Sequence, residues 1–144
     1  MATIPVFNPT IPFLGEIPCG LFPGKRLHIR GQITTGDMFN INIQSGAAIT
    51  PRDDTPLHIS IRPGARTVIL NTYQNGAWQR EEDGRCRLSK GDTFKMLIKV
   101  KKSHYTVKID GKKICKFKHR LPVEQAKFIH VGVGAVIESI TEST

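Results

Sequence analysis

The sequence predicts an all-β protein with the architecture of a two-sheet antiparallel β-sandwich. No window of about ten residues repeats apolar side chains at i, i+3, i+4 and i+7, the spacing of an amphipathic helix. Short runs of alternating apolar and polar residues follow one another instead, and turn residues separate them roughly every 8 to 14 positions. Many short strands with frequent turns are typical of a sandwich in which each strand buries one face.

The predicted strands are defined by this alternation. In residues 25–33, for example, Leu27 and Ile29 alternate with polar neighbours, so one face of the strand is apolar. The last run, residues 128–140, forms either two short strands or one that is broken by glycine. The other alternating runs are residues 38–46, 56–62, 67–72, 93–102, 104–110 and 112–120.

Local signals predict how these strands are connected. Asn75 and Asp110 are each followed by glycine, and such dipeptides readily take the positive φ that tight hairpins need. Near the C-terminal end, Ile114 and Phe117 fall out of strict alternation, which predicts a β-bulge or burial on both sides. Residues 121–126 suit a single helical turn.

Length and composition fit one soluble domain with a proper core. The chain has 144 residues, of which 39% are hydrophobic and 23% charged. No apolar run is long enough to span a membrane. Residues 1–24 are rich in proline and glycine, so we expect an extended arm whose prolines confine strands to a sheet edge. The same prolines argue against a secretory signal, which predicts a cytosolic protein.

Cysteine and histidine patterns predict neither a disulfide framework nor a bound metal. Cys19, Cys86 and Cys115 are odd in number and lack CxxC spacing, so we expect free thiols in a reducing compartment. The five histidines show no HxH or HExxH spacing, and therefore no metal site and no cofactor is predicted.

The net charge of +9 has two interpretations. Much of it lies between Lys95 and Arg120, where it either attracts polyanions or forms the solvated faces of antiparallel strands. Single-strand nucleic-acid binders interleave basic residues with exposed aromatic rings. Phe94, Tyr105 and Phe117 fall in apolar positions, so nucleic acid is not expected as a partner.

Residues 58–83 hold the polar groups that suggest a function. His58, Ser60 and Arg62 share one face of a strand, because side chains two residues apart point the same way. Trp78, the only tryptophan, precedes a run of acids. A flat apolar ring among hydrogen-bonding groups suits a sugar, and a solvated strand face is the alternative interpretation.

Catalysis is not predicted for this stretch. Glu81 and Asp83 would lie about 7 Å apart on one face of a single strand, whereas glycosidase acids flank a cleft from opposite sides. His58 and Ser60 are accompanied by no oxyanion-hole motif such as GxSxG. We therefore expect a binding protein and not an enzyme.

Over nearly its whole length the sequence resembles the galectins, soluble β-galactoside-binding lectins with a jelly-roll sandwich and no signal peptide. The resemblance implies one galectin-type carbohydrate-recognition domain over residues 1–144, with residues 1–10 as an N-terminal arm. It also implies galactose-containing glycans as partners and export without a signal peptide, and it leaves open whether the protein forms a homodimer. The segments that carry it are IPFLGEIPCGLFPGKRLHIRGQI, FNINIQSG, HISIR…ILN…WQRE, KGDTFKMLIKV, YTVKIDGKKICKFKHRLP and IHVGVGAVIESI.

The family's sugar-binding pattern is H-x-N-x-R, then V-x-N, then W-x-x-E-x-R, and five of its positions match here. By this resemblance His58 and Arg62 would bond the axial 4-hydroxyl of galactose, and Asn71 would reach the 6-hydroxyl. Trp78 would stack on the apolar face of the sugar ring. Glu81 would bond the 6-hydroxyl and orient the arginine.

Two sugar-contacting positions depart from the pattern: Ser60 replaces an asparagine and Asp83 replaces an arginine. Ile69 stands in place of the valine. The serine forfeits a hydrogen bond of about 0.5–1.5 kcal/mol, and the acid replaces a charge-assisted bond of roughly 1.5–3 kcal/mol by repulsion from Glu81. Together these losses, about 2–4 kcal/mol, weaken binding roughly 30- to 1,000-fold. Two hypotheses follow. The chain is a lectin with weakened or altered galactoside specificity, or it has lost that binding and acts through protein–protein contacts or polyanions.

Overall fold

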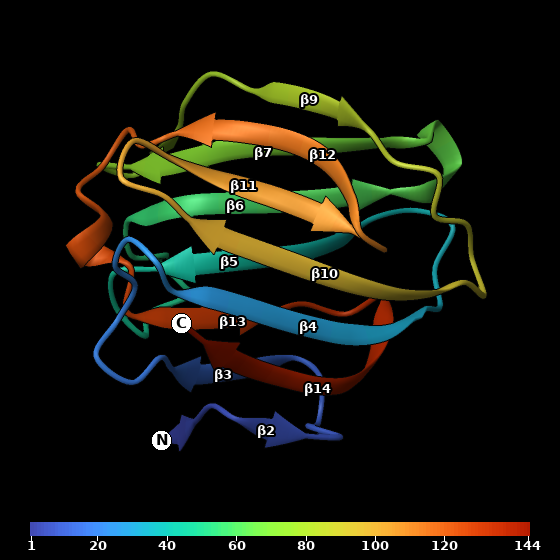
Figure 1. Cartoon of the computed structure of the whole chain (residues 1–144), viewed down its shortest axis with the longest axis horizontal. Coiled ribbons are helices and arrows are strands. Elements are labelled where there is room, and N and C mark those ends of the chain that lie inside the picture. Colours follow the sequence, from blue (N-terminus) through green and yellow to red (C-terminus); the bar gives the residue numbers. More distant parts are fainter.

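The computed structural model describes all 144 residues and contains two β-sheets packed face to face (Figure 1). This arrangement confirms the predicted sandwich. The strands are β1 (Ala2–Thr3), β2 (Val6–Phe7), β3 (Phe13–Glu16), β4 (Arg26–Ile33), β5 (Phe39–Gln44), β6 (Thr55–Arg62), β7 (Thr67–Gln74), β8 (Ala77–Trp78), β9 (Glu82–Arg85), β10 (Thr93–Val100), β11 (His104–Ile109), β12 (Lys112–Lys118), β13 (Phe128–Val131) and β14 (Ala135–Ser143).

Some consecutive strands pair with each other, as in β5-β6-β7 and β10-β11-β12, and elsewhere the chain crosses from one sheet to the other, as between β4 and β5. The eight-stranded sheet runs β1-β3-β13-β5-β6-β7-β8, with β9 also paired to β7. The six-stranded sheet runs β12-β11-β10-β4-β14-β2 and faces the reader in Figure 1. All pairings are antiparallel except that of β1 with β3.

The core lies between the two sheets and is built by the alternation described above. In β4, Leu27, Ile29 and Ile33 are fully buried, and β5 contributes Phe39 and Ile41 in the same way. A single cluster of 32 buried residues fills this space. The polar residues of the same strands are left on the two outer faces of the sandwich, and any ligand site must be built there.

The turns form where the sequence predicts them. Asn75 and Gly76 have φ values of 53° and 77°, and Asp110 and Gly111 have 51° and 81°. Two successive positive φ values are those of the tight hairpin turn that matches the twist of the strands. These hairpins join β7 to β8 and β11 to β12, so the second hairpin fixes where the lysines of β12 fall.

The predicted bulge and helical turn are also present. Val107 pairs with Cys115 while the next residue, Lys108, pairs with Lys113, so Ile114 is the extra residue of a β-bulge. The helical turn η2 spans Val123–Gln125. Both helical turns, η2 and η1 (Pro63–Ala65), are too short to cross a membrane.

The proline-rich residues 1–24 contribute to both sheets. β1 and β2 are edge strands, as the prolines predict. β3 contains no proline and lies one position further in, between β1 and β13. Lys25 then donates to the carbonyls of Pro18 and Gly20 and forms a 2.9 Å ion pair with Glu142 of β14. These contacts hold the end of the arm against the six-stranded sheet.

Candidate functional site

A polar row crosses four neighbouring strands on the outer face of the eight-stranded sheet. His130 of β13, Asn42 of β5, His58 of β6 and Asn71 of β7 lie directly opposite one another in the strand register. His58 Nδ1 lies 2.6 Å from Asn42 Oδ1, and the Asn42 amide nitrogen lies 3.4 Å from His130 Nδ1. The sheet therefore links the predicted site residues His58 and Asn71 to two residues outside the predicted set.

The hydrogen bond that His58 donates to Asn42 fixes which ring nitrogen carries the proton. An amide oxygen only accepts, so His58 Nδ1 carries the proton and Nε2 keeps a free lone pair. Burial first, and then the charges of Arg52 and Arg62, lower the pKa of His58 from 6.5 to about 4. At neutral pH the ring is uncharged and presents a hydrogen-bond acceptor, Nε2.

Trp78 lies beside His58 and is held by two aromatic contacts. Its ring centroid is 4.4 Å from that of His58, with the planes tilted by 53°. Tyr73, its partner across the β7–β8 hairpin, meets it at 5.0 Å and 65°. Trp78 is nevertheless 46% exposed. Its ring is therefore an apolar surface that is held in one orientation and is open to solvent.

Ser60 and Arg62 continue the polar face of β6. Arg62 Nε donates to Ser60 Oγ across 3.3 Å, and Arg62 forms no ion pair. Ser60 is fully buried and lies opposite Asn40 of β5, whose Oδ1 is buried without a partner. The serine thus retains one contact to the arginine and leaves its cross-strand neighbour unsatisfied.

The prediction that Glu81 and Asp83 share one face of a strand is wrong. Residues 79–81 form no strand, because the chain bends after β8, and β9 begins only at Glu82. Glu81 is exposed, and neither of the two ion pairs of the molecule joins it to Arg62. Asp83 pairs with Ile69 in the β7–β9 register.

Arg120 is a residue of this region that sequence reasoning missed. It follows β12 in the six-stranded sheet, and its guanidinium reaches across the edge of the sandwich. Nη2 lies 2.8 Å from Glu82 Oε2, and Nη1 donates to the Arg80 carbonyl at 2.7 Å and towards Asn71 Oδ1 at 3.4 Å. Arg120 therefore fastens the segment that follows Trp78. No local signal could reveal this, because Arg120 and Asn71 are 49 residues apart in the chain.

Asn71 is held from several sides. Its Nδ2 donates to the Gln79 carbonyl at 2.9 Å, and its Oδ1 accepts from the Thr72 backbone N–H at 2.7 Å. The residue is only 4% exposed. Since an amide nitrogen carries two protons, one N–H of Asn71 remains for a ligand.

The site is an open surface and not a deep cavity. The larger hollows lie elsewhere, on the outer face of the six-stranded sheet and beside β9. No group of three or more His, Cys, Asp or Glu side chains is arranged to hold a metal ion. An aromatic plate, a neutral histidine and an unpaired arginine on an open sheet can bind a hydroxylated ligand by stacking and hydrogen bonding.

Comparison with known proteins identifies the family of this chain. The family model for galactoside-binding lectins matches residues 12–142. The chain is 33% identical over 118 residues to a 32 kDa β-galactoside-binding lectin of Haemonchus contortus, covering 81% of this chain and 42% of that lectin. It is 32% identical over 140 residues to galectin-4 of Bos taurus, covering 94% of this chain and 41% of that protein. The chain thus spans less than half the length of these curated relatives.

The fold is also that of solved structures. The crystal structure of galectin LEC-6 from Caenorhabditis elegans superimposes with a TM-score of 0.85 over 97% of this chain and 96% of LEC-6. The two share 23% sequence identity, so this likeness concerns the fold. The match of the family model over almost the whole chain shows more: the chain belongs to the galactoside-binding lectins, the galectin family.

Proposed function

We propose that the outer face of the eight-stranded sheet binds galactose-containing glycans without catalysis, with weakened or altered specificity. The observation that carries this proposal is the pairing of a neutral His58, whose Nε2 can only accept, with the exposed ring of Trp78 at 4.4 Å. Galactose has an axial 4-hydroxyl above an apolar ring face, and this pair offers a partner to each. The names of the relatives support the same ligand class.

Each remaining group has a place in this binding mode. The 4-hydroxyl donates to His58 Nε2 and accepts from the unpaired guanidinium of Arg62, while the apolar face of the sugar lies on Trp78. The free N–H of Asn71 is available to the 6-hydroxyl, and the exposed carboxylate of Glu81 can accept from it. Each bond between neutral groups contributes about 0.5–1.5 kcal/mol, so few losses can be tolerated.

The two departures from the family pattern support the proposal that specificity is weakened or altered. Ser60 holds Arg62 by one hydrogen bond of 3.3 Å. The longer side chain of asparagine would offer further hydrogen-bonding groups at this position. Asp83 places a negative charge where the family pattern has a positive one. The cation of the same strand is Arg85, which lies two residues after Asp83 and pairs with Thr67 of β7. A ligand group beyond galactose therefore meets a different charge pattern.

The test is a titration with lactose and a panel of galactosides, followed by tryptophan fluorescence. Trp78 is the only tryptophan, so any change reports on the site. We expect a saturable change with galactosides and none with glucose, whose 4-hydroxyl is equatorial. A His58→Ala variant should lose the response while keeping its melting temperature within a few degrees. If millimolar galactosides leave the spectrum of the native protein unchanged, the proposal is wrong.

A second candidate is a galectin fold that has lost galactoside binding and acts through protein–protein contacts. The unsatisfied Asn40 Oδ1 opposite Ser60 favours it, because an amide at position 60 would be able to donate to that oxygen. The Ser60→Asn, Asp83→Arg double variant distinguishes the two candidates. If the double variant binds galactosides and the native chain does not, the second candidate is supported. If the native chain binds galactosides, the second candidate is excluded.

A further inference from the structure

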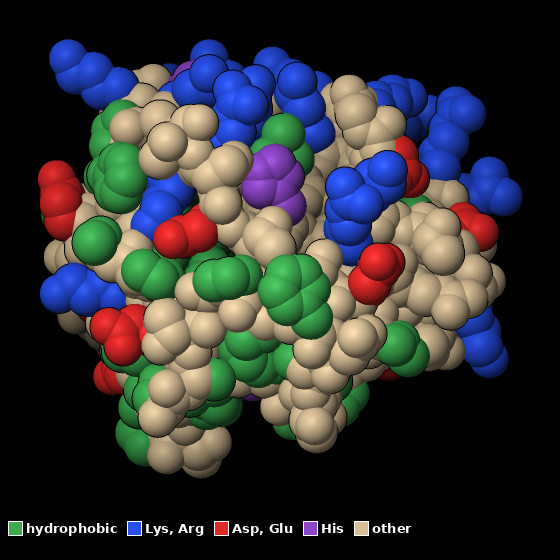
Figure 2. All heavy atoms as spheres, turned by 60° about the horizontal axis from the view of Figure 1, so that its bottom comes forward, with side chains coloured by type: hydrophobic (Ala, Val, Ile, Leu, Met, Phe, Trp, Pro, Cys, Tyr) green, Lys and Arg blue, Asp and Glu red, His purple; other side chains and the backbone are tan.

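The outer face of the six-stranded sheet carries a dense group of cations, far from the galactoside site. Core-facing side chains of β4, β10, β11 and β12 alternate with residues that point outwards, and most of the outward residues are basic. Figure 2 shows Lys and Arg side chains crowded along the top of the view, on the side of the sheet that faces the reader in Figure 1. We call this surface the basic face, and its central cations are Arg26, Arg30, Lys95, Lys99, Lys108 and Lys116.

Like charges are placed directly opposite one another on the basic face. Lys95 pairs with Arg30 and Lys99 with Arg26 in the β10–β4 register. Directly opposed like charges destabilise an antiparallel sheet. The pKa of Lys99 is lowered, with Lys108 as the largest cause, followed by Arg26.

No ion pair neutralises this repulsion. The molecule contains two ion pairs, Lys25–Glu142 and Arg120–Glu82, and neither involves a central cation of the basic face. A bound polyanion would supply the missing negative charge, and the repulsion in the free protein would then become attraction.

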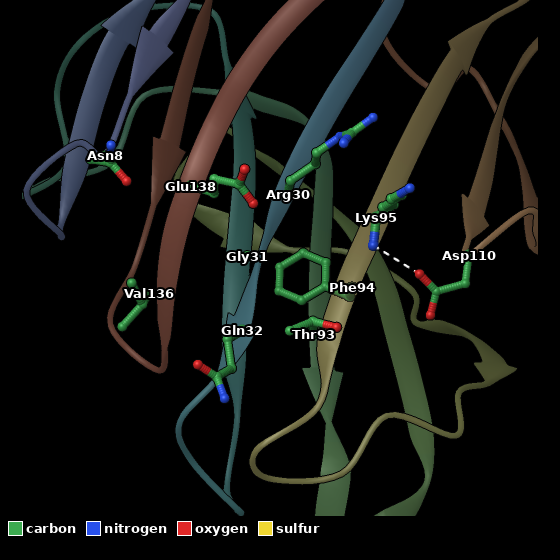
Figure 3. A pocket seen from close by; sticks show the side chains of 10 residues that line it. All are labelled: Asn8, Arg30, Gly31, Gln32, Thr93, Phe94, Lys95, Asp110, Val136 and Glu138. Atoms are coloured by element: carbon green, nitrogen blue, oxygen red, sulfur yellow. Dashed lines mark hydrogen bonds between the residues drawn. The ribbon is translucent and has the colours of Figure 1, made fainter.

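The basic face is hollowed along a line that follows β4 and β10. A cavity of about 410 Å³ lies beside Arg30 and Lys95, with Glu138 at one side and Asp110 at the other (Figure 3). The next, of about 120 Å³, shares Arg30 and Lys95 and continues to His28. These hollows begin a track along the strand pair.

A third cavity, of about 160 Å³, lies further along the same two strands. It is lined by Arg26 and Lys99 and by Lys101 and Lys102. Lys95 and Lys99 are four residues apart on one strand, so the cationic pairs repeat after about 13 Å. The track therefore offers two opposed pairs of cations about 13 Å apart.

The shape and chemistry of the track select among polyanions. Proteins that bind single-stranded nucleic acid combine a basic groove with exposed aromatic rings, but Phe94, Tyr105 and Phe117 of this sheet are at most 2% exposed. A membrane is flat and cannot enter a line of hollows. A flexible linear chain with many sulfate groups can follow the hollows and place a charge at each cationic pair. We propose that the basic face binds a linear sulfated polysaccharide, laid along β4 and β10 on the side opposite the galactoside site.

The test uses a heparin oligosaccharide as the probe and measures its affinity at two salt concentrations. The Arg26→Gln, Lys99→Gln variant removes one opposed pair while keeping most of the stem of each side chain. We expect roughly a fivefold loss for each cation, or about 25-fold in all, by analogy with cations at an anionic surface. The matched control is Arg66→Gln, Arg87→Gln, which removes the same charge from a second basic hollow beside β9.

The outcomes separate this proposal from its alternatives. Affinity for heparin should fall with salt, survive excess lactose and persist in Trp78→Ala, while Arg26→Gln, Lys99→Gln should leave the galactoside response unchanged. Equal losses in the two double variants would mean that net charge alone attracts heparin, and the proposal would be overturned. It would equally be overturned if phosphatidylserine vesicles or single-stranded DNA bound the native protein as tightly as heparin does.

Discussion

Lowering the pH tests the environment that the structure gives to His58. A histidine in the unfolded chain has its ordinary pKa of 6.5, whereas burial and the charges of Arg52 and Arg62 lower that of His58 to about 4 in the folded protein. Between these values the unfolded state binds more protons, so the free energy of unfolding falls as the pH falls. This difference in pKa lowers the free energy of unfolding by about 3 kcal/mol at about pH 4 and has almost no effect above pH 7.

The assay is NMR titration of the imidazole signals of His58, with urea unfolding between pH 7.5 and 4 as a second measurement. We expect a midpoint near pH 4 and galactoside affinity that is flat from pH 7.5 to 5.5, because Nε2 stays an acceptor over that range. The Arg52→Gln variant should move the midpoint upwards, since it removes the second cause of the shift. Arg87→Gln, on an exposed loop, should leave it in place. A midpoint at or above pH 6 in the native protein would refute the reasoning.

Three further predictions concern other parts of the chain. Arg120→Ala should cost about 1–2 kcal/mol of stability and weaken galactoside binding, because it frees the segment after Trp78. Arg120→Lys should recover part of the stability, measured by unfolding, and part of the galactoside affinity, measured by fluorescence titration. Gly31→Ala should destabilise the protein by about 1–3 kcal/mol in urea, because its Cβ would collide with the backbone of β14, while Gly36→Ala, in open space, should be nearly neutral. A thiol reagent should modify the exposed Cys19 before Cys115, because burial raises the pKa of the Cys115 thiol to about 12; faster modification of Cys115 would contradict its burial.

Local pattern was sufficient for most of the fold. Alternation identified the strands, and the Asn75 and Asp110 turns and the bulge at Ile114 followed from the preferences of single residues and neighbours. The same logic placed His58, Ser60 and Arg62 on one face of β6. It failed at Glu81, where the chain leaves the strand after Trp78, because irregular backbone has no period to detect.

The sequence by itself determined that this chain is a β-sandwich of the galectin type with a polar row next to its only tryptophan. Only the tertiary structure decided what holds that row. The hydrogen bond that His58 donates to Asn42 joins β6 to the neighbouring strand β5, and Arg120 reaches Glu82 from the other sheet. Such partners are set by strand register and by the packing of two sheets, which join residues that are distant in the chain. Alternation along one strand tells which side a residue faces, and the neighbour that it meets there depends on the whole fold.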